Sequence, residues 1–236
     1  MRGGILRKVI SEKKAIIFDL FHTLASVEYA WSNIPRTTNS SILGISQEKW
    51  NEQLLEKSVD RLRGKVKDPL TIVRQMAHAI DPQIPLDLVE KATENRIEMF
   101  HRTMLRIPDS TIKTLQKLKD DGKKLGLLSN ADVSEVASWN ESPISCFFDS
   151  TVFSCEVGFV KPERQTYEIS LQRLSLSPED VVFVGDGGSH ELEGAKEMGI
   201  STVFIAGWIR ELWPEKIEAR KKLADYSIES IEELIS

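Results

Sequence analysis

The chain has 236 residues, of which 41% are hydrophobic and 28% are charged, an ordinary composition for one large globular domain or for a domain with an insertion. Its net charge of −5 leaves no basic surplus for a nucleic-acid partner, and no apolar run approaches the roughly 20 residues of a membrane span. The start lacks the apolar stretch of a signal peptide, and two cysteines, Cys146 and Cys155, are too few for a disulfide framework. We therefore expect a cytoplasmic protein with buried, reduced thiols and no membrane partner.

The first predicted strand is a short β-prone run that ends on a carboxylate. Residues 15–18 are Ala-Ile-Ile-Phe, and Asp19 follows them directly. The next 80 or so residues contain no such run, and apolar positions repeat there with a helical period over residues 48–62, 69–80 and 86–104. An all-helical segment inserted after the first strand would lie above the carboxyl edge of the sheet, so we expect it to act as a lid.

The remainder of the chain alternates between helix and strand patterns. Helix is predicted from Asp109, as the capping residue, to Gly122, and again over residues 163–174 and 191–198. Strands are predicted over residues 124–128, 151–153, 181–185 and 202–205. This alternation indicates βαβ units and therefore an α/β fold with a parallel sheet.

Polar or charged side chains stand at the ends of the predicted strands or shortly after them. In chain order they are Asp19, Ser129 with Asn130, Lys161 with Pro162, and Asp186. In open parallel sheets, ligands bind outside the carboxyl ends of the strands. These residues are therefore the candidates for an active site.

The series resembles the four motifs of the haloacid dehalogenase-like (HAD) hydrolase superfamily. Those motifs are Asp-x-Asp-x-Thr, a strand ending in Ser or Thr, a lysine often followed by proline, and Gly-Asp followed by an acid, here Glu191. Two positions depart from the pattern: Phe21 replaces the second aspartate, and Gly187, which we interpret as a tight turn, stands where the family often has a polar residue. The resemblance implies a Rossmann-like parallel-sheet core of residues 1–25 and 106–236, with an inserted all-helical cap domain of residues 26–105.

The resemblance also implies a role for each of these residues. Asp19 would be the nucleophile that attacks phosphorus to form an aspartyl-phosphate, Ser129 would donate a hydrogen bond to a phosphoryl oxygen, and Lys161 would balance charge. Mg²⁺ would offset the repulsion between the carboxylate of Asp19 and the anionic phosphate. Its implied ligands are Asp19, the backbone carbonyl of Phe21, Asp186 and Glu191, although Glu191 fits better as a residue that orients Lys161 or a metal-bound water. The implied catalytic set is Asp19, Thr23, Ser129, Asn130 and Lys161.

Phe21 removes a group on which phosphatases of this family depend. The aspartate at this position protonates the leaving group and then activates the water that cleaves the acyl-phosphate. General acid–base catalysis typically raises the rate roughly 10²–10⁴-fold. We therefore expect a phosphatase for a small phosphorylated metabolite that is slow or selective, unless another residue supplies the missing acid. His22 is adjacent, but on an extended segment it would point away from Asp19, and it fits better as a packing or cap-contact residue.

Other functions stay open. Dehalogenases of the family also lack the second aspartate and need no metal, but they typically lose the acid that Asp186 supplies here. They also need a cap arginine, for which Arg36, Arg61 and Arg63 are candidates. A non-catalytic module that binds a phosphorylated ligand is a third possibility, and phosphonate cleavage fits least because Phe21 is bulky. The chain is expected to be a monomer or a homodimer.

Overall fold

The core of the protein is a six-stranded parallel sheet with the first strand near its centre. The computed structural model describes residues 2–55 and 59–236. The strand order is β3-β2-β1-β4-β5-β6, and every neighbouring pair is parallel. Phe18 at the carboxyl end of β1 is in register with Leu127 and Val184, so the segments that follow β1, β2 and β4 emerge at one edge. The strands are Ala15–Phe18 (β1), Lys124–Ser129 (β2), Ser150–Phe153 (β3), Val181–Gly185 (β4), Ser201–Ile205 (β5) and Tyr226–Ile228 (β6).

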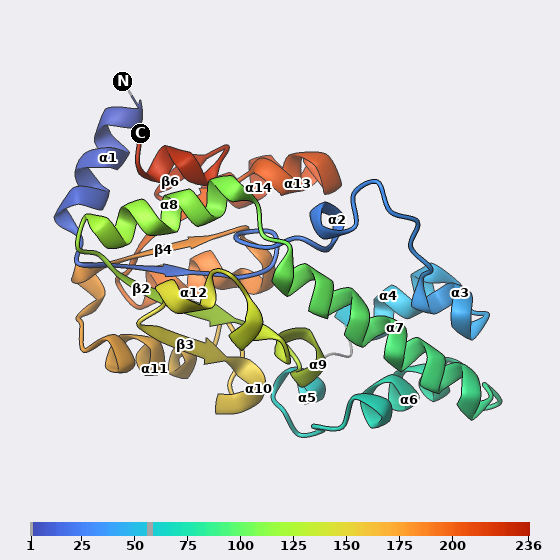
Figure 1. The fold of residues 1–236 in the computed structure, drawn as a ribbon. Coiled ribbons are helices and arrows are strands. Elements are labelled where there is room, and N and C mark those ends of the chain that lie inside the picture. Colours follow the sequence, from blue (N-terminus) through green and yellow to red (C-terminus); the bar gives the residue numbers. More distant parts are fainter. Residues whose placement is uncertain (1, 56–58) are drawn as a thin grey trace.

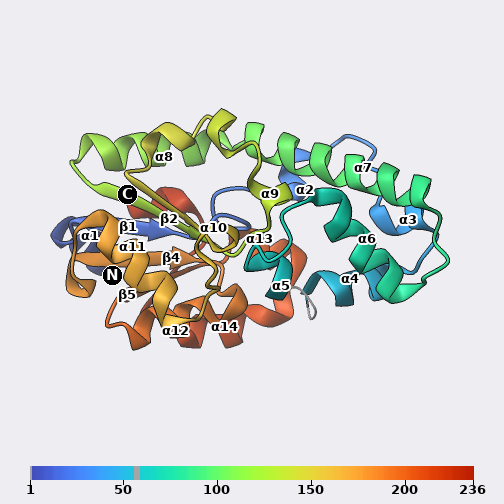
Figure 2. The same cartoon turned by 90° about the horizontal axis from the view of Figure 1, so that it is seen from below.

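Helices cover both faces of this sheet (Figures 1 and 2). Helices α1 (Arg2–Glu12) and α8 (Asp109–Asp120) lie on one face, and α11 (Arg164–Leu174) and α12 (Glu191–Glu197) lie on the other. Successive side chains of a strand point to opposite faces. Ile16 and Phe18 of β1 therefore pack with the first pair of helices, and Ile17 packs with the second.

Among the described residues, six helices inserted between β1 and α8 lie beyond the carboxyl ends of the strands (Figure 1). The third, fourth, sixth and seventh helices of the chain share an apolar core of their own, which includes Trp50, Val73 and Val89. Local signals position the start of α6, which begins with Pro69 and is capped by the side chain of Asp68. We call these six helices the cap: α2 (Val27–Ala30), α3 (Asn39–Leu43), α4 (Gln47–Leu55), α5 (Val59–Leu62), α6 (Pro69–Ile80) and α7 (Leu86–Leu105).

The remaining elements are short. The α-helices are α9 (Val133–Val136), α10 (Ser154–Val157), α13 (Gly207–Leu212) and α14 (Ile217–Leu223). The 3-10 helices span Trp139–Glu141, Ser145–Phe147, Pro178–Asp180, Gly188–His190, Pro214–Lys216 and Ile231–Leu234. Within the described part of the chain, every helix is too short or too polar to cross a membrane.

The structure confirms the predicted α/β class, the parallel sheet and the helical insertion, and it corrects several details. Helix α6 has the predicted bounds, whereas the helix predicted over residues 48–62 consists of α4 and α5, and residues 56–58 of that prediction lie outside the described residues. Pro108 is the N-cap of α8, so Asp109 is its first helical residue rather than its cap. Cys146 is exposed, and only Cys155 is buried as expected.

Two buried arginines of the cap form ion pairs with the core helix α9. Arg61 Nη1 lies 2.6 Å from Asp132 Oδ2 and 3.2 Å from Glu135 Oε1. Arg96 Nη2 lies 2.8 Å and 2.5 Å from the same two atoms. The side chain of Arg96 is 2% exposed and that of Asp132 is 0% exposed. Separating buried charges would leave them without partners, so these pairs hold the cap against α9.

Asp132→Asn tests this attachment. The asparagine can still cap α9, but it removes one of the two carboxylate charges that both arginines face, so we expect the unfolding free energy at pH 7 to fall by about 3–5 kcal/mol. Burial by itself raises the pKa of Asp132, but Arg96 and Arg61 lower it below its ordinary value of 3.8. Its contribution to stability is therefore fully present above that value and is lost as the pH falls below it. Urea unfolding at a series of pH values should show the difference from wild type shrinking below a pH of about 4.

The matched control is Asp68→Asn. Asp68 also caps a helix through its side chain, but it is exposed and caps α6 on the outside of the cap. We expect a much smaller change in unfolding free energy for this variant. Equal losses in the two variants would mean that capping, rather than the ion pairs with Arg61 and Arg96, explains the role of Asp132.

Candidate active site

Three buried carboxylates meet at the carboxyl edge of the sheet. Asp19 follows β1, and its amide donates a hydrogen bond to the carbonyl of Val184 at 2.9 Å, which ties it to β4. Asp186 follows β4, and Glu191 is the first residue of α12. One carboxylate oxygen from each of Asp19, Asp186 and Glu191 lies within 4.8 Å of the other two. The structure therefore brings together the three side chains that the sequence predicts as metal ligands.

The ammonium of Lys161 lies between two of these carboxylates. Lys161 Nζ is 2.6 Å from Asp19 Oδ1 and 2.5 Å from Glu191 Oε2, and the lysine is 4% exposed. Asn130 fixes the lysine backbone, because its Oδ1 accepts from the Lys161 amide at 2.7 Å and its Nδ2 donates to the Lys161 carbonyl at 3.1 Å. Asn130 thus positions Lys161. Glu191 also accepts from the amide of Gly187 at 3.0 Å, which favours an orienting role for Glu191 over direct metal binding.

Burial and crowding shift the proton affinities of this cluster. Burial raises the pKa of Asp19 in spite of Lys161, and the nearby Asp186 adds to the rise. Burial also raises the pKa of Glu191 well above its usual range. Burial by itself would lower the pKa of Lys161, but Asp19 and Glu191 outweigh that effect and raise it. A further cation would relieve this crowding of carboxylates, and oxygen ligands are those that Mg²⁺ prefers. The residues present therefore fit a magnesium ion.

Two hydroxyl groups lie at the same edge. Thr23 Oγ1 donates to Asp19 Oδ2 at 3.2 Å. Ser129 ends β2, and its hydroxyl oxygen is buried without a hydrogen-bond partner among the described residues. An unsatisfied buried hydroxyl costs free energy, so it suits a ligand that accepts a hydrogen bond. Ser129 does not reach the cavity wall in this structure, and its role as a donor stays a prediction.

The loop after Asp19 turns sharply toward the cap. The ring of Phe21 packs edge-on against Phe100 of α7, with centroids 5.5 Å apart. His22 has a φ of +58°, so the assumption of an extended segment at this residue is wrong. Its Nε2 lies 3.3 Å from Glu28 Oε2 in α2, and its ring contacts Trp213. The predicted cap contact of His22 is therefore present, although His22 also lines the cavity.

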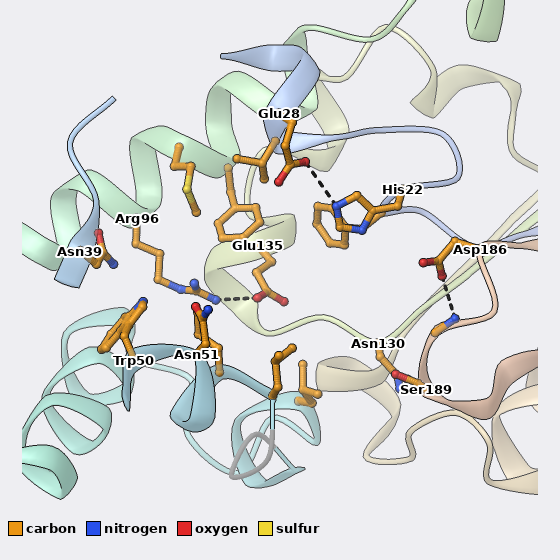
Figure 3. Close-up of a pocket in the computed structure, with 18 of the residues that line it drawn as sticks. His22, Glu28, Asn39, Trp50, Asn51, Arg96, Asn130, Glu135, Asp186 and Ser189 are labelled. Carbon is orange, nitrogen blue, oxygen red and sulfur yellow. Dashed lines mark hydrogen bonds and ion pairs between the residues drawn. The ribbon is translucent and has the colours of Figure 1, made fainter. Parts of the chain in front are cut away.

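A cavity of about 590 Å³ lies between the core and the cap. This volume is within the range of roughly 300–1,000 Å³ that is typical of small-molecule sites. Asp19, Asn130, Lys161, Asp186 and Glu191 line its core side. Asn39, Trp50, Asn51, Asn95 and Arg96 line its cap side, and Figure 3 shows Arg96 and Glu135 meeting between the two sides. Trp50 is 3% exposed, and it both packs in the core of the cap and lines the cavity.

The cap arginines differ in what they can bind. Arg61 is held by Asp132 and Glu135, and Arg63 pairs with Glu163. Arg36 is exposed and lines the cavity. Of the three candidates for a dehalogenase anion site, only Arg36 faces the cavity without a carboxylate partner among the described residues.

Sequence reasoning missed two arginines of this site. Arg96 belongs to the ion pairs with α9, and Arg220 of α14 contacts Asp186 from 34 positions further along the chain. Neither lies in a motif, and no local pattern marks either residue. The interpretation of Gly187 as a tight turn agrees with its φ of +77°.

The chain is similar to known phosphatases and dehalogenases. The chain is 29% identical over 233 residues to the glyceraldehyde 3-phosphate phosphatase of Methanocaldococcus jannaschii, covering 94% of this chain and 95% of the relative. It is 27% identical over 210 residues to the (S)-2-haloacid dehalogenase 4A of Burkholderia cepacia, covering 84% of each. The crystal structure of a dehalogenase shares the fold, with a TM-score of 0.66 and 23% identity over 94% of this chain and 95% of that one. The sequence model of the haloacid dehalogenase-like hydrolase family matches residues 13–199, which include Asp19, Lys161 and Asp186. The chain therefore belongs to the haloacid dehalogenase-like hydrolase family.

Proposed function

We propose that this hydrolase is a Mg²⁺-dependent phosphatase that acts on a small phosphorylated metabolite. The observation that carries the proposal is the buried cluster of Asp19, Asp186 and Glu191 around Lys161. In this proposal Asp186 binds the metal, which dehalogenases of the family do not need, so its retention favours a phosphatase. The similarity to a glyceraldehyde 3-phosphate phosphatase over nearly the whole chain supports the same reaction class.

In this proposal each residue has one task. Asp19 attacks phosphorus and carries the phosphoryl group as a mixed anhydride until water cleaves it. Lys161 holds Asp19 in place and offsets the negative charge of the phosphoryl oxygens. Ser129 donates to one of these oxygens, and Thr23 orients Asp19. Mg²⁺, held by Asp19, Asp186 and the Phe21 carbonyl, with Glu191 as a less direct contributor, would supply charge stabilisation.

Because Phe21 stands in place of an aspartate, it cannot donate a proton to the leaving group. Its ring instead packs on Phe100 and so connects the loop after Asp19 to α7 of the cap. We propose that the enzyme is consequently slow with general substrates, and that it favours substrates whose leaving group needs little protonation.

Dehalogenation is the second candidate. The aromatic residue at position 21, the relative in Burkholderia cepacia and the exposed Arg36 at the cavity favour it. Retention of Asp186 and the engagement of Arg61 and Arg63 by carboxylates argue against it. A non-catalytic phospholigand-binding module is the third candidate, and the intact contact between Lys161 and Asp19 argues against that one.

We also propose a division into two domains. The core would comprise residues 1–25 and 106–236, and the cap domain would comprise residues 26–105. We propose a cytoplasmic protein, monomeric or homodimeric, whose partner is a small phosphorylated molecule rather than nucleic acid or membrane.

Asp186→Asn tests the metal assignment. The variant should release phosphate from an aryl phosphate at least roughly 100-fold more slowly than wild type, because the loss of a charged metal ligand weakens stabilisation of the phosphoryl group. Asp180→Asn is the matched control: Asp180 precedes the same strand and pairs with Lys14, away from the site. The metal assignment is wrong if Asp186→Asn keeps full activity.

Phe21→Asp tests the missing acid. With Mg²⁺, turnover of an aryl phosphate should rise by roughly 10-fold or more, toward the 10²–10⁴-fold that general acid–base catalysis contributes. Phe21→Leu is the control, since it also loses the ring contact with Phe100 but gains no acid. If neither variant is faster than wild type and both stay folded, another residue already supplies the proton.

A further inference from the structure

A guanidinium from the C-terminal part of the chain contacts the strand-end acid Asp186. Arg220 Nη1 in α14 donates to the backbone carbonyl of Asp186 and to its Oδ2, both at 2.8 Å. The side chain of Arg220 is 16% exposed and lines the cavity. The other carboxylate oxygen, Oδ1, accepts from the amide of Gly188 at 2.9 Å. Two donors from separate parts of the chain thus fix the orientation of one carboxylate.

Gly187 makes this arrangement possible. A Cβ atom at Gly187 would lie 3.1 Å from Cδ of Arg220 and 3.2 Å from its Cβ and Cγ, so the arginine stem packs directly over this glycine. A side chain at this position would require the arginine stem to shift by a few tenths of an ångström. The glycine therefore lets the stem of Arg220 lie directly over the loop that follows Asp186.

We propose that Arg220 is a positioning residue that orients Asp186 for Mg²⁺, an inference that rests on the proposed metal-dependent function. A carboxylate that binds metal does so best when its other hydrogen bonds hold it in the binding orientation, and loss of such a partner typically costs roughly 10–100-fold in metal affinity or activity. The positive charge of Arg220 opposes metal binding. The three carboxylates nevertheless outnumber Lys161 and Arg220, so the cluster still attracts a cation.

The direct test is calorimetric titration of Mg²⁺ into the purified protein without substrate. Arg220→Met keeps the stem over Gly187 but removes the donor, so its Mg²⁺ dissociation constant should rise by roughly 10-fold or more. Arg220→Lys keeps a charged donor and should recover part of the affinity. Lys221→Met removes the same charge from an exposed position of the same helix and should bind Mg²⁺ like wild type.

Steady-state kinetics separate positioning from a general structural defect. For Arg220→Met, the Mg²⁺ concentration that gives half-maximal activity should rise, while kcat at saturating Mg²⁺ stays close to the wild-type value. Unchanged or tighter Mg²⁺ binding by Arg220→Met would overturn the inference, and tighter binding would make Arg220 a competitor of the metal. If wild type itself binds no Mg²⁺, the proposed function fails, and the role of Arg220 fails with it.

Discussion

The ammonium of Lys161 lies between the buried carboxylates of Asp19 and Glu191, and the candidate active site at this edge of the sheet depends on the contact. Burial of two carboxylates and a lysine is costly unless the charges are paired. Asn130 contributes by fixing the lysine backbone at both its amide and its carbonyl. The parallel register of β1, β2 and β4 brings these segments to one edge, so the fold positions the charges before any ligand arrives.

A second set of buried charges joins the cap to the core and continues toward the first motif. Arg96 pairs with Asp132, its guanidinium lies 4.8 Å from the centroid of the Phe100 ring, and Phe100 packs on Phe21. The loop after Asp19, the longest cap helix and α9 are therefore in continuous contact. Phe21, which stands where the resemblance leads one to expect a second aspartate, contacts the cap in this structure.

The sequence predicted the parts of the site that have a local signature. Asp19, Ser129 and Asp186 each follow a buried apolar run, so their shared edge follows from the parallel sheet. No local pattern marks the positive φ of His22, so the expectation that alternating side chains of an extended segment would point it away from Asp19 did not apply. Arg220 and Arg96 were missed because their partners lie 34 and 36 positions away in the chain. Strand β6 has only three residues, too few for a periodic pattern.

The most direct measurement of the central claim is a paired assay of the wild-type protein, with phosphate release from an aryl phosphate and halide release from 2-chloropropionate, each with Mg²⁺ and with chelator. The cluster of Asp19, Asp186 and Glu191 predicts phosphate release that needs Mg²⁺ and stops with chelator. Halide release that continues in chelator, without phosphate release, would contradict the account and identify the protein as a dehalogenase.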